Sequence, residues 1–95
     1  MKLDISNEAA SWYKKELDLK EDASLRFFAR YGGVGGKIPG FSLGVTMDTP
    51  ENKHTSKEID GITFFIEEAD VWYFEDSNLQ ITLDKTLSEP EFQYV

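Results

Sequence analysis

The sequence predicts an α+β domain, mainly β, in which antiparallel strands form curled sheets packed on one N-terminal helix, with one further short helix. Three observations carry this prediction: several segments alternate between apolar and polar residues, one segment has apolar residues at helical spacing, and glycines are concentrated in a single loop. A length of 95 residues is enough for one hydrophobic core but not for two. We therefore expect residues 1–95 to form a single domain.

The N-terminal segment predicts a short strand followed by the main helix. Residues 1–5 alternate in polarity, and Ser6 is a suitable N-cap because its hydroxyl can accept a hydrogen bond from an amide of the first turn. The apolar residues that follow recur at helical spacing: Ala9, Trp12, Tyr13 and Leu17. We expect these side chains to form one buried stripe and the helix to end near Leu17.

A strand, a glycine-rich loop and a second strand come next. In residues 25–31 alternate side chains define an inner face: Leu25, Phe27, Ala29 and Tyr31. Five of the seven glycines then fall between positions 32 and 40, where the backbone must turn tightly. Because alternation resumes in residues 41–47, we expect a hairpin with a long loop.

The second half of the chain predicts several short elements. Residues 49–56 are typical of a surface loop, and Asp60-Gly61 between apolar residues is a strong signal for a tight hairpin turn. The elements expected after this turn are a strand at 62–66, a short helix within 67–76, a strand at 79–84 and an edge strand at 92–95. Their number and shortness favour a mainly β fold.

Composition excludes several classes of function. The formal net charge of -8 argues against nucleic-acid binding, because phosphate backbones attract basic surfaces. The absence of cysteine excludes thiolate nucleophiles and cysteine-ligated clusters, and the single histidine, His54, cannot form a histidine cluster. No apolar run approaches the roughly 20 residues of a membrane helix, and the N-terminus lacks the apolar region of a signal peptide. We therefore expect a cytoplasmic protein that binds neither nucleic acid nor membrane.

Three segments, together with the order of the elements, are similar to a known family. They are LRFFARYGGVGG, FSLGV and DGITFFIEEADVWYFEDSNLQITL. Over nearly the whole chain they resemble the HesB/IscA-like fold of A-type iron-sulfur carriers, and most of all the small cysteine-free HesB-like proteins of Gram-positive bacteria. Gly32-Gly33 and Gly35 match the loop glycines of that family, and Asp60-Gly61-Ile62 matches the start of a strand. The resemblance implies a single HesB-like domain.

The positions that hold iron or a cluster in that family differ here. The first cysteine of the family motif falls on Val34, and residues 91–95 contain no counterpart of the C-terminal cysteine pair. A valine side chain has no lone pair to offer a metal. The resemblance therefore implies a fold that has lost iron-sulfur cluster ligation and has kept a surface for a protein partner.

The glycine loop has two interpretations. In the structural one, the glycines allow a tight crossover between two strands, with Val34 as an apolar plug. In the functional one, backbone amides of the loop converge on a small anion or metabolite, assisted by cationic side chains. The candidate ligand-binding residues are Gly32, Gly33, Val34, Gly35, Gly36, Arg30 and Lys37. The loop is neither a P-loop nor a dinucleotide fingerprint, because a strand rather than a helix follows it.

A group of carboxylates in the later part of the chain also has two interpretations. Its members are Glu67, Glu68, Asp70, Glu75 and Asp76. In one interpretation they supply oxygen ligands to a hard cation, as in an iron-related carrier that uses carboxylates. In the other they form a solvated helix face, which the lack of EF-hand spacing favours. We assign no metal site and no cofactor.

The aromatic residues fit buried stripes, with three exceptions. Trp12, Tyr13, Tyr31 and Trp72 are expected in the core. Tyr73, Phe74 or Phe28 are the candidates for an exposed patch that contacts a protein partner.

The residue types do not indicate an enzyme. A nucleophile–base pair is hard to build without cysteine and with one distant histidine, so we assign no catalytic residue. We predict a non-enzymatic protein-binding or adaptor domain with an unknown protein partner. The alternatives are binding of a small anion or metabolite at the glycine loop and the carboxylate-based carrier. The sequence does not indicate the oligomeric state.

Overall fold

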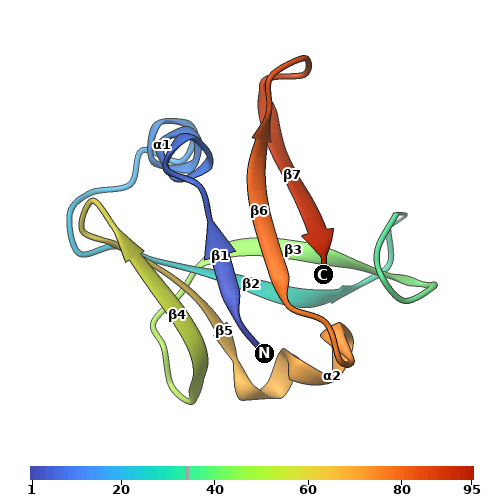
Figure 1. The fold of residues 1–95 in the computed structure, drawn as a ribbon. Coiled ribbons are helices and arrows are strands. Elements are labelled where there is room, and N and C mark those ends of the chain that lie inside the picture. The colour runs from blue at the N-terminus through green and yellow to red at the C-terminus, as the bar shows by residue number, and fades with distance from the viewer. Residues whose placement is uncertain (34) are drawn as a thin grey trace.

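A computed structural model describes residues 1–33 and 35–95 and confirms an α+β fold that is mainly β (Figure 1). The helices in this part of the chain are α1 (Asn7–Glu16), the short 3₁₀ helix η1 (Glu68–Asp70) and α2 (Val71–Phe74). The strands are β1 (Leu3–Ile5), β2 (Ser24–Tyr31), β3 (Phe41–Met47), β4 (Lys53–Ile59), β5 (Ile62–Glu67), β6 (Leu79–Asp84) and β7 (Glu89–Tyr94). One long N-terminal helix and one short later helix agree with the sequence prediction.

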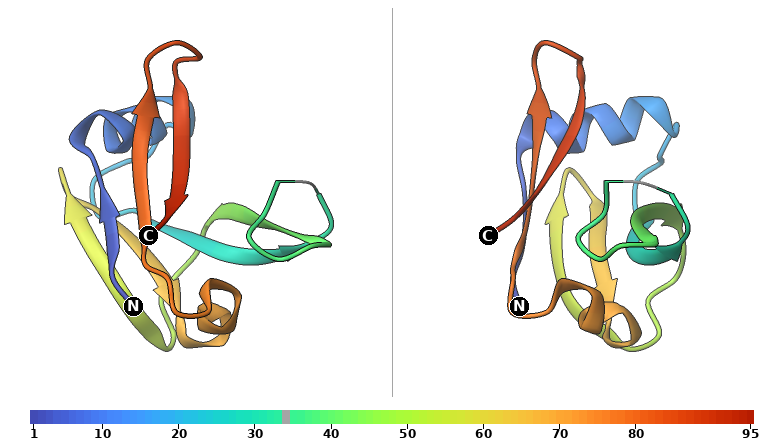
Figure 2. Two further views of the ribbon diagram at one scale, coloured as in Figure 1. Left: turned by 45° about the vertical axis from the view of Figure 1, so that its right-hand side comes forward. Right: turned by 90° about the vertical axis from the view of Figure 1, so that its right-hand side faces the viewer.

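The strands form two sheets, with strand orders β1-β6-β7 and β3-β2-β5-β4. Figure 2 shows the hairpin of β6 and β7 standing across the direction of β2 and β3. The prediction of antiparallel strands is right only in part, because β1 pairs with β6, and β2 with β5, in parallel. A parallel neighbour requires a long connection, so it joins strands that are distant in the sequence and that no hairpin signal identifies.

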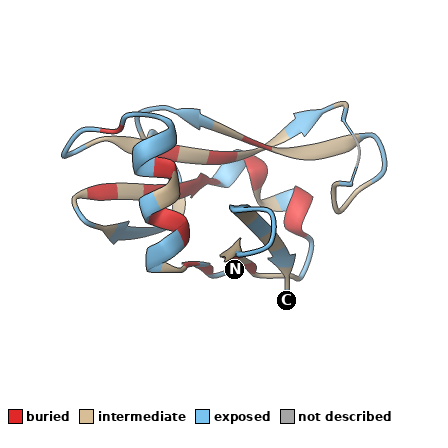
Figure 3. Ribbon diagram, turned by 90° about the horizontal axis from the view of Figure 1, so that it is seen from above, coloured by how far each residue is buried: buried red, intermediate tan, exposed pale blue. Residues whose placement is uncertain are grey.

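The helix α1 begins and packs as its sequence dictates. The Ser6 hydroxyl accepts a hydrogen bond from the Ala9 amide at 3.1 Å, which confirms the predicted cap. Tyr13 is buried edge-on against Phe27, with ring centroids 5.7 Å apart, and burial raises the pKa of its hydroxyl. Leu17 follows the end of the helix and is 40% exposed, so the buried stripe is shorter than predicted. Figure 3 shows buried residues on α1 and on the strands beside it.

None of the helices described is long and apolar enough to cross a membrane.

Two strands and one turn test the finer sequence predictions. Asp60 and Gly61 have φ of 52° and 78°, as a tight hairpin turn of two left-handed residues requires, so this prediction is confirmed. Residues 53–56 belong to β4, and their prediction as loop was wrong. The polar strand is held by backbone pairing with β5 at the sheet edge, so apolar alternation is not required. The last strand begins at Glu89, three residues before the predicted start at 92.

Phe28 lies across β3 in a space that a glycine provides. Gly44 is the register partner of Phe28, and a Cβ on Gly44 would stand 2.4 Å from the ring. Phe28 is therefore half-buried, and its prediction as part of an exposed patch was wrong. The missing side chain of Gly44 is a packing requirement of this face of the sheet.

A buried carboxylate attaches the segment that carries α2 to β2. Asp70 accepts a hydrogen bond from Arg26 Nη2 at 2.7 Å and another from the Ala29 amide at 3.3 Å. The hydrogen bond that Arg26 donates to Asp70 raises the pKa of the Arg26 guanidinium, and the exposed Asp48 adds a second ion pair at 3.2 Å. Because α2 has only four residues, this attachment sets its position beside the outer half of β2.

We expect Gly44→Ala to destabilise the fold by about 1–3 kcal/mol, because the new methyl group must displace the Phe28 ring. Urea denaturation measures this cost in the wild-type and in the Phe28→Ala background. In the second background the ring is absent, and the cost of Gly44→Ala should fall to a few tenths of a kcal/mol. Equal costs in the two backgrounds would contradict the contact.

We expect Asp70→Asn to lower the free energy of unfolding by about 2 kcal/mol, because Arg26 loses its less exposed charged partner. Asp48→Asn is the matched control: Asp48 is 42% exposed in its side chain, and its replacement should cost no more than about 0.5 kcal/mol. Thermal and urea denaturation of both variants measure the difference. The attachment is refuted if the control is as destabilised as Asp70→Asn.

Candidate functional site

Three aromatic side chains form a line at the outer end of the β2–β3 hairpin, in which the outer two are exposed and Phe41 is half-buried, and we call them the aromatic row. Tyr31 ends β2, Phe41 begins β3 and Trp72 lies in α2. The Phe41 ring meets Tyr31 at 5.5 Å and Trp72 at 5.2 Å between centroids, edge to face in both pairs. Tyr31 is 85% exposed and Trp72 is 52% exposed. The edge-to-face contacts hold the three rings in fixed positions relative to one another and form an aromatic surface.

The sequence placed these aromatics in the core, and this was wrong for Tyr31 and Trp72. Leu25 and Phe27, at the start of the same alternation as Tyr31, are fully buried as predicted. The β2–β3 hairpin then extends away from the other elements (Figure 2), and Tyr31, on the same face near its end, is exposed. Alternation identifies the face of a strand and does not reveal how far the core extends along it.

Two of the three residues predicted for an exposed aromatic patch are instead buried. Tyr73 and Phe74 have no exposed surface. The Tyr73 hydroxyl accepts a hydrogen bond from the Lys37 amide at 2.8 Å and makes another with the Tyr94 hydroxyl at 3.2 Å. Desolvation, with the Tyr73 hydrogen bond, raises the pKa of Tyr94. Tyr73 therefore joins the glycine loop, α2 and β7 behind the aromatic row.

The glycine loop folds back directly onto β3. A Cβ on Gly36 would lie 2.0 Å from the Phe41 carbonyl oxygen, and one on Gly33 would lie 2.7 Å from Ser42 Oγ. Gly32 donates a hydrogen bond to the Gly40 carbonyl at 2.7 Å, which closes the loop. These contacts favour the structural interpretation, because a larger residue at position 36 has no space.

The candidate ligand-binding residues do not gather round one point. Arg30 is exposed and makes no ion pair with any residue described. Lys37 lies 3.7 Å from Glu75 and 5.7 Å from the centre of the Tyr94 ring. Val34, the predicted apolar plug, lies outside the described residues. A hollow of about 200 Å³ adjoins part of the loop; its lining residues are Gly35, Gly36, Ser42, Leu43, Phe92 and Tyr94.

The predicted carboxylate group is dispersed. Glu67 is buried and accepts hydrogen bonds from the backbone amides of Glu51 and Asn52. Glu68 meets His54 Nδ1 at 2.7 Å, whereas Glu75 lies 3.7 Å from Lys37. Within residues 1–33 and 35–95, no three histidine or acidic side chains are placed to hold a metal ion. The prediction of a solvated face is wrong for Glu67 and Asp70, which are buried.

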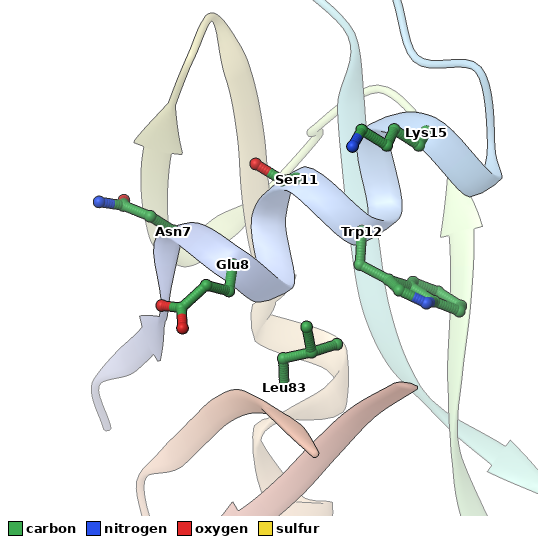
Figure 4. A pocket seen from close by; sticks show the side chains of 6 residues that line it. All are labelled: Asn7, Glu8, Ser11, Trp12, Lys15 and Leu83. Atoms are coloured by element: carbon green, nitrogen blue, oxygen red, sulfur yellow. The ribbon is translucent and has the colours of Figure 1, made fainter. Parts of the chain in front are cut away.

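An open hollow of about 380 Å³ lies along the outer face of α1, where Figure 4 shows Leu83 of β6 beneath the helix. The residues that line it are Asn7, Glu8, Ser11, Trp12, Lys15 and Leu83. Charges of both signs, from Glu8 and Lys15, are typical of a solvated helix face. Trp12 is held at its edge by a hydrogen bond from the indole nitrogen to the Ser88 carbonyl at 2.8 Å.

The chain is similar over most or all of its length to several bacterial proteins. It is 47% identical over 94 residues to a protein of Bacillus subtilis named pyruvate dehydrogenase inhibitor, and the match covers 99% of both chains. It is 42% identical over 92 residues to an uncharacterized protein of Staphylococcus saprophyticus, with 94% of both chains covered. An uncharacterized protein of Staphylococcus aureus is 35% identical over 86 residues, which cover 87% of this chain and 88% of that protein. No protein-family model matches the chain, and no solved structure matches it with significance.

These relatives correct the resemblance to the HesB/IscA-like carriers, which was wrong. The relatives described above carry no carrier name, and no family model supports the carrier assignment. The glycines that suggested it have a local explanation, because Gly36 packs against the Phe41 carbonyl with no space for a side chain and Gly33 has a φ of 80°. With 47% identity over 99% of both chains, the protein belongs to the family of the Bacillus subtilis pyruvate dehydrogenase inhibitor.

Proposed function

We propose that this chain is a non-enzymatic regulator that binds pyruvate dehydrogenase and inhibits it by contact. The observation that carries the proposal is the 47% identity to the protein named pyruvate dehydrogenase inhibitor, which extends over 99% of both chains. We infer that the inhibitory surface lies within the fold that the two chains share, because the match extends over nearly all of the sequence compared.

The aromatic row is the surface best suited to hold such a partner. Tyrosine and tryptophan are enriched among the residues that contribute most to binding energy, because they bury a large area and lose little conformational freedom. Here the edge-to-face contacts of Phe41 with Tyr31 and Trp72 hold the rings before a partner arrives. The entropic cost of ordering these side chains when a partner binds is therefore small.

The charges around the row indicate the chemistry of the partner surface. Glu68, Glu75 and Asp76 are exposed and lie within four residues of Trp72 in the sequence. The whole chain carries a net charge of -8. We infer that the partner offers lysine or arginine side chains around an apolar pocket, since opposite charges accelerate association and orient the two surfaces.

A second candidate function is the binding of a small anion or metabolite at the glycine loop. The hollow of about 200 Å³ beside Gly35 and Gly36 supports it, because Ser42 and Tyr94, two residues with hydroxyl groups, are among those that line it. Its size suits a small molecule and not a nucleotide. This candidate is compatible with the first, since a ligand in the hollow would contact the segment that leads to the aromatic row.

We expect Trp72→Ala and Tyr31→Ala each to weaken binding to purified pyruvate dehydrogenase of the same organism by about 10- to 100-fold, and to weaken inhibition in parallel. Leu87→Ala is the matched control, because Leu87 is also exposed and apolar but lies at the β6–β7 turn. Calorimetry gives the affinity and an enzyme assay gives the inhibition. If the wild-type chain neither binds nor inhibits the enzyme, the proposed function is wrong; if the aromatic variants match Leu87→Ala, only the assignment of the surface is wrong.

For the second candidate, we expect a screen of small anions and metabolites to raise the melting temperature of the wild-type chain. Gly35→Val should abolish the shift, because φ of 81° at Gly35 is strained for a β-branched residue. Arg30→Ala should reduce the shift if its guanidinium contacts the ligand. A screen in which no anion or metabolite changes the melting temperature would remove this candidate.

A further inference from the structure

We propose that the groove between β3 and β7 binds an extended segment of the partner polypeptide, which adds as a strand to the free edge of β3. The identity of the partner rests on the proposed function, so the segment is assigned to pyruvate dehydrogenase. Its chemistry follows from the groove: apolar side chains at alternate positions, with a lysine or arginine near the α1 end.

The groove consists of two hollows that share Phe92. The first, of about 320 Å³, lies against α1; its lining residues are Trp12, Tyr13, Leu17, Val45, Glu89, Pro90 and Phe92. The second is the hollow of about 200 Å³ beside the glycine loop, where Phe92 lies next to Leu43 and Tyr94. Both hollows are lined by residues of β3 and of β7, so a segment that follows β3 would pass beside each in turn.

The backbone of β3 is available along this groove. β3 is the end strand of its sheet, and β7 is an end strand of the other sheet. In an antiparallel pair, alternate residues direct their N–H and C=O groups away from the neighbouring strand. Apart from the pairing with β2, residues 42–46 make no backbone hydrogen bond to any residue described. An extended segment can satisfy these groups whatever its sequence.

The side chains of the groove have the period of an extended chain. Leu43 and Val45 of β3, and Pro90 and Phe92 of β7, are alternate residues of their strands, and they wall the two hollows. An added strand turns every second side chain to the same face, so successive apolar residues would enter the two hollows in order. This match favours an extended segment over a helix, whose side chains recur at a different spacing.

Charge identifies a partner polypeptide rather than a second copy of this chain. Glu89 is the charged residue that lines the groove, so it favours a cationic side chain on the occupant. A second copy would bring another chain of net charge -8. The groove also adjoins the aromatic row, since Ser42 of the groove follows Phe41 of the row. One partner can therefore cover both surfaces without a break.

Hydrogen exchange of the wild-type chain, with and without pyruvate dehydrogenase, tests the backbone part of the proposal. We expect amide exchange in residues 42–46 to slow on binding, while exchange in β4, the opposite edge of the same sheet, stays unchanged. Unchanged exchange in residues 42–46 of the bound chain would overturn the groove proposal and leave the proposed function standing.

Two charge variants on one strand test the side-chain part. We expect Glu89→Lys to weaken binding of the enzyme by about 10-fold or more, because it places a cation opposite the cation of the segment. Glu91→Lys makes the same charge change on β7 outside the groove lining, and it should stay within about twofold of the wild type. Equal effects of the two variants would overturn the groove proposal.

A third variant and a mass measurement complete the test. Val45→Lys should weaken binding as Glu89→Lys does, and its thermal unfolding is measured alongside so that loss of fold is recognised. Light scattering of the free wild-type chain should give the mass of a monomer; a dimer whose formation slows exchange in residues 42–46 would assign the groove to a second copy instead. If the wild-type chain does not bind pyruvate dehydrogenase at all, the proposed function and this assignment both fall.

Discussion

The candidate interface depends on one buried carboxylate. Asp70 accepts hydrogen bonds from Arg26 and from the amide of Ala29, and so fixes the short α2 against the outer half of β2. A helix of four residues has too few hydrogen bonds of its own to keep a position. Trp72 meets Phe41, and Tyr73 reaches the glycine loop, because of this attachment. The order of an exposed aromatic surface therefore comes from an ion pair that lies behind it.

The sequence predicts those elements whose signal is local. The Ser6 cap, the Asp60-Gly61 turn and the alternation of β2 and β3 act within a few residues, and the structure contains all of them. The first half of β4 was not predicted, because a polar strand at a sheet edge is stabilised by backbone hydrogen bonds and shows no alternation of apolar residues in its sequence. The parallel pairings of β1 with β6 and of β2 with β5 were not predicted, because these strands are far apart in the sequence and only the complete fold brings them together.

The candidate site was less predictable than the fold, for two physical reasons. Tyr31 has the same alternation as the buried Leu25 and Phe27, and only the extent of the core separates them. The glycine loop resembles a motif of cofactor-related proteins, whereas close packing on β3 at position 36 and a φ of 80° at position 33 are sufficient to favour glycine there. A glycine pattern reports where the backbone lacks space, and several unrelated functions can share that requirement.

The two edges of the four-stranded sheet differ in how they resist self-association. β4 carries charged side chains at Lys53, Lys57 and Glu58, which discourage pairing with another sheet, whereas β3 presents Leu43 and Val45 beside an unpaired backbone. In the free protein, the electrostatic repulsion between chains of net charge -8 opposes self-association through this edge. Acidification toward the isoelectric point of about 4.5 removes that repulsion, so the colloidal stability of the unbound protein is tied to its ionisation state.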